Sequence, residues 1–389
     1  MKIVGVICEY NPFHKGHKKQ FDIIRNIHGP DTAIVCLMSG NYVQRGAPAI
    51  FDKMARAEAA LCSGADLILE LPITASLSSA EGFADRAVSI LSGICDYLCF
   101  GTESHNVESL TDTAKLLLSP DFSQSLKAAL SSGKSFPAAR QEALIHLGGK
   151  NFDISKPNDI LAIEYCKAII QKKCSMEPMP IPRPGDYHDT EPDLENPSAT
   201  AIRERICNHL DWNPYVPDCV QSIFNHATVH SLHFGERSIL TKLRLMDEDQ
   251  FAALPFGSEG LWRRFMHATR KHASVEDILI ATKTKRYTRS RIDRMLMCAF
   301  LGITQDTMDA PVSYVRILGF NDTGRNVLRT SNSTYRLVNI GDVQKDDYQI
   351  LENRCSDLYG LFANGSPELP GKEQQYRVIY LSGQHSNEA

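Results

Sequence analysis

The chain opens with an apolar run that ends in two histidines: Ile3-Val4-Gly5-Val6-Ile7-Cys8-Glu9-Tyr10-Asn11-Pro12-Phe13-His14-Lys15-Gly16-His17. Residues 2–8 are rich in β-branched side chains and almost continuously apolar, which is typical of a central strand covered on both faces. Asn11-Pro12 ends this strand. A helix is predicted over residues 17–27, because its apolar side chains recur at helical spacing. The two histidines therefore lie where a strand's carboxyl end meets a helix's amino end.

This junction predicts a polyphosphate site. A helix start offers unpaired backbone N–H groups and the positive end of the helix dipole, and Gly16 lets the backbone approach a ligand closely. His14 and His17 can hydrogen-bond phosphate oxygens and stabilise charge on departing pyrophosphate. Two alternatives stay open. One is a capping turn in which one histidine is structural; the other is a zinc site, although no His or Cys cluster at ligand spacing completes it.

Composition narrows the class of protein. The 389 residues are enough for two or three domains. A net charge of -4 argues against an evenly basic nucleic-acid coat but leaves local patches open. The eleven cysteines lie mostly in apolar runs and indicate reduced core thiols. We find no signal peptide and no apolar run of bilayer length, so we expect a cytoplasmic protein without membrane contact.

Strands and helices alternate through the first hundred residues. The predicted strands are 3–8, 33–37, 67–71 and 97–100, and the helices between them are 17–27, 53–63 and 80–91. This order predicts an α/β fold with a doubly wound parallel sheet. Ligands of such sheets bind beyond the carboxyl ends of the strands, which gathers residues 9–17, 39–41, 70–72 and 101–103 at one crevice. Four more helices and a strand near 179–181 are expected to follow.

The alternation stops near residue 212. We expect one domain over 1–212 and a second, mainly helical one over 213–389 that ends in a small α/β tail after Val312. Residues 260–294 hold ten Lys or Arg against three Asp or Glu, interleaved with Trp262, Phe265 and Tyr287. Such a block suits an RNA backbone with an aromatic for stacking. A solvated charged face is the common alternative.

Other polar residues follow predicted strands or begin predicted helices. Ser198-Ala199-Thr200-Ala201-Ile202-Arg203 fits a second helix start with its arginine aimed at the same phosphates, or a plain capping box. Arg45 is a candidate for binding pyrophosphate or a carboxylate, because a guanidinium matches both by paired hydrogen bonds; a surface turn is the alternative. Asn158 can meet a base or ribose or act as a cap. Lys53 and Arg56 are interpreted as a solvated helix face.

Together these residues resemble a known superfamily. His14-Lys15-Gly16-His17 and the segment 198–203 resemble the two motifs of the HIGH nucleotidyltransferases, with Ala199 and Ala201 as modest departures. A narrower resemblance, from residue 3 to about 330, is to the bacterial tRNA(Met) cytidine acetate ligase family. It rests on Glu9-Tyr10-Asn11-Pro12-Phe13-His14-x-Gly16-His17, Ser39-Gly40-Asn41-x-x-Gln44-Arg45-Gly46, Pro157-Asn158-Asp159-Ile160-Leu161 and Lys285-Arg286-Tyr287-Thr288.

The resemblance implies an enzyme that activates acetate with ATP, releases pyrophosphate, and acetylates N4 of the wobble cytidine, C34, of elongator tRNA(Met). ATP with Mg²⁺ and acetate are the expected co-substrates. No protein partner and no metal-ligating residues are expected. It also implies that residues 1–212 bind ATP and residues 213–389 bind the tRNA.

The same resemblance implies the ATP contacts, while the catalytic residues follow from the chemistry of the two motifs and the tRNA contacts from the basic block. The expected catalytic residues are His14, His17 and Arg203. The expected ATP contacts are Ile7, Cys8, Glu9, Tyr10, Asn11, Pro12, Phe13, His14, Lys15, Gly16, His17, Lys18, Lys19, Gln20, Gly101, Asn158 and Arg183. The expected tRNA contacts are Lys283, Lys285, Arg286, Tyr287, Arg289 and Arg291. Two other functions stay open: an adenylyltransferase that makes a dinucleotide-type cofactor from a phosphorylated small molecule, and a non-catalytic RNA-binding protein.

Overall fold

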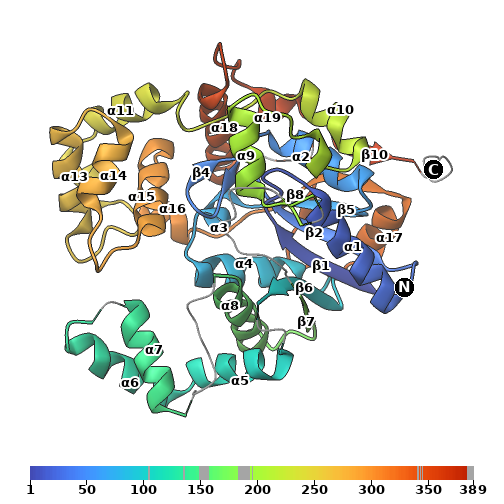
Figure 1. Ribbon diagram of the computed structural model, residues 1–389, viewed down its shortest axis with the longest axis horizontal. Helices are drawn as coiled ribbons and strands as arrows, with labels where there is room; N and C mark the ends of the chain where they lie inside the picture. The colour runs from blue at the N-terminus through green and yellow to red at the C-terminus, as the bar shows by residue number, and fades with distance from the viewer. Residues whose placement is uncertain are drawn as a thin grey trace.

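A computed structural model describes residues 1–103, 106–134, 136–148, 157–182, 193–194, 196–339, 341, 343 and 345–382 (Figure 1). A twisted sheet lies at the centre of the molecule, with helices on both faces. Two helical groups extend from it: α5 to α7 on one side and α11 to α16 on another. No helix in the described ranges is long and apolar enough to cross a membrane.

The sheet confirms the predicted α/β class. Its order is β10-β8-β5-β2-β1-β6-β7, with β9 pairing with β8. The bounds are β1 (Ile3–Cys8), β2 (Ala33–Ser39), β5 (Leu67–Leu71), β6 (Tyr97–Thr102), β7 (Glu177–Pro182), β8 (Val315–Asn321), β9 (Leu337–Val338) and β10 (Ile379–Leu381). The first five are parallel. Strand β1 lies between β2 and β6, where the winding of the chain reverses, and this is where parallel sheets bind ligands.

Each face of the sheet has its own apolar core, because alternate side chains of a strand point to opposite faces. Val35 and Leu37 of β2 belong to the core under α4, α8 and α17. Ile34 and Cys36 belong to the core under α1, α2 and α10. The bounds of the helices nearest the sheet are α1 (Lys15–His28), α2 (Lys53–Cys62), α3 (Ile73–Ser76), α4 (Ala80–Leu91), α8 (Pro157–Gln171), α9 (Ala199–Cys207), α10 (Asp218–His226) and α17 (Asp322–Thr330).

A third apolar core holds together the helical region beyond residue 230. Its helices are α11 (Glu236–Leu245), α12 (Glu248–Ala252), α13 (Leu261–Lys271), α14 (Val275–Thr282), α15 (Arg289–Leu301), α16 (Gln305–Asp309) and α18 (Asp347–Tyr359). The remaining helices are α5 (Val107–Leu117), α6 (Pro120–Ser131), α7 (Phe136–His146) and α19 (Lys372–Gln375). The division of the chain at residue 212 stays a prediction.

The chain after Val312 differs from the expected separate tail. Strand β8 pairs antiparallel with β5, and β10 pairs parallel with β8. The C-terminal strands therefore extend the main sheet. The partner of β8 is β5, a strand from the first part of the chain, and no local pattern can identify such a distant partner.

Lys53 and Arg56 are buried, so their interpretation as a solvated face is wrong. The Lys53 ammonium lies 2.8 and 2.9 Å from the carboxylate oxygens of Glu70 and 2.5 Å from that of Glu373. The Arg56 guanidinium is fully covered and donates to main-chain oxygens of Glu9, Ser39, Gly40 and Phe51. Buried carbonyls at strand ends need donors, and this arginine supplies them.

Candidate active site

A pocket of about 480 Å³ opens at the carboxyl ends of β1 and β6. Its wall is built from the turn after β1, the hairpin of β3 (Tyr42–Val43) and β4 (Ala47–Pro48), and the first turns of several helices. The size lies within the range of small-molecule sites. Among its lining residues are the predicted Ile7, Cys8, Glu9, Tyr10, Asn11, His17, Gln20, Gly101, Asn158 and Arg203.

Four helices begin at this pocket. His17 in the first turn of α1, Ala80 of α4, Asn158 of α8 and Thr200 of α9 all line it. Each helix start carries partial positive charge and N–H groups that have no partner within the helix. Four such ends around one cavity favour a ligand with several negative charges, as a triphosphate has.

His14 and His17 form a capping box at the start of helix α1. Nδ1 of His14 accepts from the Gly16 N–H at 3.1 Å, and Nδ1 of His17 accepts from the His14 N–H at 3.2 Å. Because both Nδ1 atoms accept a hydrogen bond, we infer that the proton of each neutral ring is on Nε2. The rings stack with centroids 3.7 Å apart. Both histidines therefore take part in capping α1 as acceptors, and His17 also lines the pocket.

The turn before the histidines orients them. Tyr10 has a left-handed backbone, with φ of 44°, and its ring packs edge-on against His17 at 4.8 Å. Burial above all, together with the nearby Cys36 thiol, raises the pKa of Tyr10, so its phenol stays protonated. Burial likewise raises the pKa of the Cys8 thiol. These groups shape the pocket as neutral side chains.

Some residues of the first motif lie behind the pocket and not on its wall. The lining does not include the described residues Pro12, Phe13, His14, Lys15, Gly16, Lys18 and Lys19. Phe13 and His14 are buried beneath it. Lys18 pairs with Asp22, one turn along the outer face of α1. The local sequence could not distinguish the residues that line the pocket from those that do not, because one short turn supplies both.

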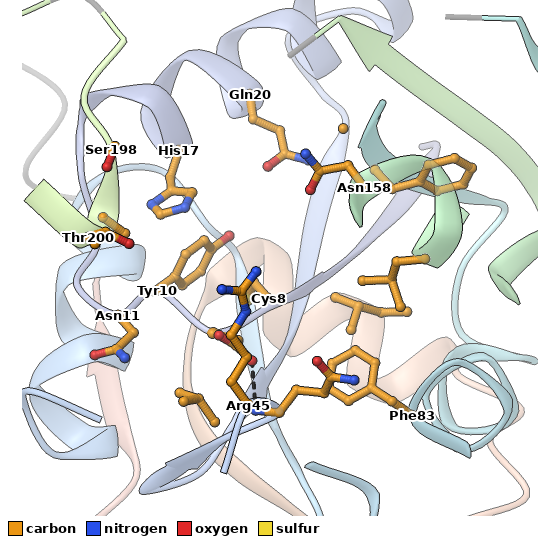
Figure 2. A pocket seen from close by; sticks show the side chains of 18 of the residues that line it. Cys8, Tyr10, Asn11, His17, Gln20, Arg45, Phe83, Asn158, Ser198 and Thr200 are labelled. Carbon is orange, nitrogen blue, oxygen red and sulfur yellow. Dashed lines mark hydrogen bonds between the residues drawn. The ribbon is translucent and has the colours of Figure 1, made fainter. Parts of the chain in front are cut away.

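The second motif contacts the first directly. Ser198 caps α9 by accepting from the Ala201 N–H at 3.2 Å. Arg203 donates to the main-chain oxygen of Asn11 at 2.6 Å and to the hydroxyl of Thr200 at 3.0 Å. Figure 2 shows Ser198 and Thr200 together on one side of the pocket, next to His17. The predicted convergence of two helix starts on one crevice is present.

Carboxylates fix the remaining wall. Glu9 accepts the Gln44 N–H at 2.8 Å, which holds the β3–β4 hairpin over the end of β1. Glu103 accepts from the Asn158 side chain at 2.7 Å and from the Asp159 N–H at 3.0 Å, which ties the start of α8 to the end of β6. The predicted ATP contact at residue 183 lies outside the described residues.

The basic block of residues 260–294 is partly structural. Tyr287 is buried, only 8% exposed, and its hydroxyl donates to the main-chain oxygen of Glu259 at 3.0 Å, so it is not an open stacking surface. Arg289 pairs with Glu276 and Asp293, and Arg286 pairs with Glu259. Arg291 donates to the Phe256 main-chain oxygen and to the Ser258 hydroxyl.

Two predicted tRNA contacts remain available at the surface. Lys283 and Lys285 are exposed, and neither forms an ion pair with a described residue. Arg263 lies over the Trp262 ring at 4.8 Å on the adjacent helix α13. An aromatic ring with an arginine beside it suits a nucleobase.

Sequence reasoning missed the apolar wall of the pocket. Phe83 of α4, together with Ile160 and Leu161 of α8, lines the cavity opposite the motif residues. In the sequence these side chains have ordinary helical spacing, which is typical of core residues. No local signal distinguishes an apolar residue that faces a ligand from one that faces another helix.

Comparison with known proteins agrees with this geometry. A model of the family described as HIGH Nucleotidyl Transferase matches residues 1–374. The tRNA(Met) cytidine acetate ligase of Clostridium novyi (strain NT) is 37% identical over 348 residues, covering 85% of this chain and 87% of that protein. The crystal structure of apo Thermotoga maritima TmcAL (form I) has a TM-score of 0.89 at 30% identity, with 98% of this chain and 100% of that chain covered.

A second crystal structure of Thermotoga maritima TmcAL, bound with alpha-thio ATP, covers the same shares of both chains with a TM-score of 0.85 at 29% identity. The Clostridium novyi relative is more than 30% identical over most of both chains, and the family model matches residues 1–374. These two matches establish the family of this chain. The chain therefore belongs to the tRNA(Met) cytidine acetate ligase family of the HIGH nucleotidyl transferases.

Proposed function

We propose that this chain is an ATP-dependent ligase that acetylates N4 of the wobble cytidine, C34, of elongator tRNA(Met), forming N4-acetylcytidine. One observation carries the proposal: His17 of the first motif and Arg203 of the second line one pocket in which four helices begin. The names of the relatives, tRNA(Met) cytidine acetate ligases, support a tRNA cytidine as the acceptor of the acetyl group. The related Thermotoga maritima protein bound to an ATP analogue supports the nucleotide.

The first step joins acetate to AMP. A carboxylate oxygen of acetate attacks the α-phosphorus of ATP and forms a P–O bond. The bond between the α-phosphorus and the bridging oxygen breaks, and pyrophosphate leaves with the electron pair. The product is acetyl-adenylate, a mixed anhydride. This step depends mainly on positioning and on neutralising phosphate charge.

The pocket residues fit that task. His17 can donate its Nε2 proton to a phosphate oxygen, and Arg203 can direct its guanidinium toward the leaving group from α9. His14 is a positioning residue, because it caps α1 and stacks on the His17 ring. Gly101 and Asn158 line the pocket beyond Gln20, where the adenosine would lie, and Ser198 and Thr200 line the phosphate end.

Magnesium enters this scheme with the nucleotide. The described part of the chain contains no group of three His, Cys, Asp or Glu residues placed to hold a metal ion. A magnesium ion commonly binds through substrate phosphates and water with few protein ligands. We therefore treat MgATP as the substrate form.

The second step transfers the acetyl group to RNA. The N4 amine of cytidine attacks the acetyl carbonyl carbon, the bond from that carbon to the AMP oxygen breaks, and N4 loses a proton. The base must leave the anticodon stack to reach the pocket. Lys283 and Lys285, with Trp262 on α13, offer charge and a ring for the surrounding RNA. We further propose that the enzyme works in the cytoplasm and needs no protein partner for this reaction.

The test is a complete reaction. The chain is incubated with MgATP, labelled acetate and total bacterial tRNA, and the tRNA is digested to nucleosides. We expect label in N4-acetylcytidine and stoichiometric release of AMP and pyrophosphate. Label in another nucleoside, or ATP consumption that depends on a phosphorylated small molecule and not on acetate, would contradict the proposal and favour the adenylyltransferase alternative. Absence of any ATP consumption would favour the RNA-binding alternative.

A further inference from the structure

The pocket has two chemically different walls. The wall formed by α1 and α9 is polar and carries His17, Gln20, Thr200 and Arg203. The wall formed by α4, α8 and β6 is apolar, with Phe83, Phe100, Ile160 and Leu161. The phosphates of ATP account for the first wall. The adenosine accounts for the part of the second wall next to Gly101 and Asn158, and the part next to Phe83 suits a second, small occupant with an apolar group.

Arg45 lies between these walls. It lines the pocket and lies on the β3–β4 hairpin directly after Gln44, whose N–H donates to the Glu9 carboxylate. Figure 2 shows it rising from the hairpin toward the middle of the pocket, with Ser198 and Thr200 on one side and Phe83 on the other. A guanidinium here can form two parallel hydrogen bonds with a carboxylate.

The hairpin that carries Arg45 is firmly held. The Tyr42 hydroxyl donates to the Cys355 main-chain oxygen at 3.1 Å. Gly46, with φ of 79°, packs so closely that a Cβ atom there would lie 2.6 Å from the backbone of Asp293 and Arg294. Arg45 therefore projects from a turn whose backbone is fixed by α15 and α18.

In-line displacement gives the direction of attack. Attacking and leaving oxygens lie on opposite sides of the α-phosphorus. If pyrophosphate departs toward Ser198, Thr200 and Arg203, the nucleophile must approach from the opposite side of the pocket. The apolar wall with Phe83 lies on that side, and Arg45 stands between it and the phosphate end.

We propose that Arg45 binds the carboxylate of acetate and that Phe83 limits the acid to two carbons by closing the space around its methyl group. This inference rests on the proposed function and adds its acid subsite. Phe83 is 3% exposed and packed in the core under α4, so its ring cannot move aside at low cost. A rigid apolar wall discriminates against each added methylene.

The first test measures acetate-dependent exchange of labelled pyrophosphate into ATP, without tRNA. Arg45→Gln should raise the KM for acetate roughly tenfold to a hundredfold, as expected for loss of a charge-assisted pair, and leave the KM for ATP within about twofold. Arg45→Lys should have a KM for acetate between those of Arg45→Gln and the wild type. Arg237→Gln, an exposed arginine on α11, is the matched control and should behave as wild type. An unchanged acetate KM, or an equal rise in the ATP KM, would overturn the role of Arg45.

The second test compares acetate with propionate. Phe83→Leu should raise the ratio of propionate to acetate kcat/KM by roughly tenfold, because it removes part of the wall. Phe83→Met is a second variant, with a side chain close to leucine in volume, and should shift the ratio in the same direction. Thermal melting verifies that both variants fold. An unchanged ratio in folded variants would overturn the size limit. If the wild-type chain shows no acetate-dependent exchange, the proposed function falls as well; normal wild-type exchange with unaltered variants removes only this inference.

Discussion

Arg203 of α9 donates to the main-chain oxygen of Asn11, 2.6 Å away, and this bond joins the two sequence motifs across one pocket. The same guanidinium holds the Thr200 hydroxyl. The arginine thus fixes the turn that precedes the histidines while facing the ligand space. Loss of this one side chain affects both walls of the phosphate site.

Arg203→Lys should lower the kcat of ATP–pyrophosphate exchange by roughly a hundredfold or more, because an ammonium cannot reproduce the guanidinium's paired contacts at an electrostatic site. Arg205→Lys is the control on the same helix, since Arg205 donates to the Asp211 main-chain oxygen away from the pocket. Exchange kinetics at saturating ATP and acetate provide the measurement. Equal effects of the two substitutions would contradict the assignment.

His14→Ala should abolish acetate-dependent exchange and leave tRNA binding intact. It should also lower the free energy of unfolding by about 1 kcal/mol, because helix α1 loses its N-cap acceptor. His14→Asn keeps an acceptor, so it should recover the stability without the activity. Denaturant titration and exchange assays separate the two effects. Full exchange by the alanine variant would rule out any role of His14 in the reaction.

Lys53→Met should destabilise the fold by about 3–5 kcal/mol, because two buried carboxylates then share a single buried cation, the Arg316 guanidinium, and one negative charge stays uncompensated. Glu70 and Glu373 both contact this ammonium, and both are buried. Lys18→Met, which breaks the exposed pair with Asp22, should cost less than about 1 kcal/mol. Urea denaturation of both variants tests the contrast. A small effect at Lys53 would show that the cluster adds little.

Replacing Lys283 and Lys285 together by Ala should weaken tRNA binding and reduce the slope of log K against log salt by about 2, one for each lost phosphate contact. Exchange without tRNA should not change. Lys115→Ala on α5, whose partner is Asp112, serves as the control. Filter binding at several salt concentrations gives the slopes. A slope equal to that of wild type would place the tRNA elsewhere.

Cys219 should react with iodoacetamide at neutral pH. The Cys62 sulfur lies 2.8 Å away and its hydrogen bond lowers the pKa of Cys219 to about 7, so the reactive thiolate forms as the pH rises through that value. Cys62→Ala removes the donor and should move the midpoint toward pH 9. Cys207, whose pKa is raised by burial, is the internal comparison. Mass spectrometry of alkylated peptides across pH reads both sites. A Cys219 midpoint near 9 in the wild-type chain would contradict the contact.

The sequence by itself determined the local elements of this protein. The strands of residues 3–8 and 67–71 and the helix of residues 80–91 have the predicted bounds, because periodicity and capping depend on near neighbours. The strand-end rule also placed Glu9, His17 and Gly101 at one crevice. The family resemblance came from blocks of residues that occur in order along the chain.

Only the tertiary structure decided which charged and aromatic residues face solvent. Lys53 and Arg56 have a surface-like pattern but pair with groups contributed by distant segments, and Tyr287 is covered within the helical region. Long-range packing likewise joined β8 to β5 and brought Arg45 and Phe83 to one pocket. Local periodicity carries no information on such partners, because burial and pairing across a fold depend on contacts between segments that lie far apart in the chain.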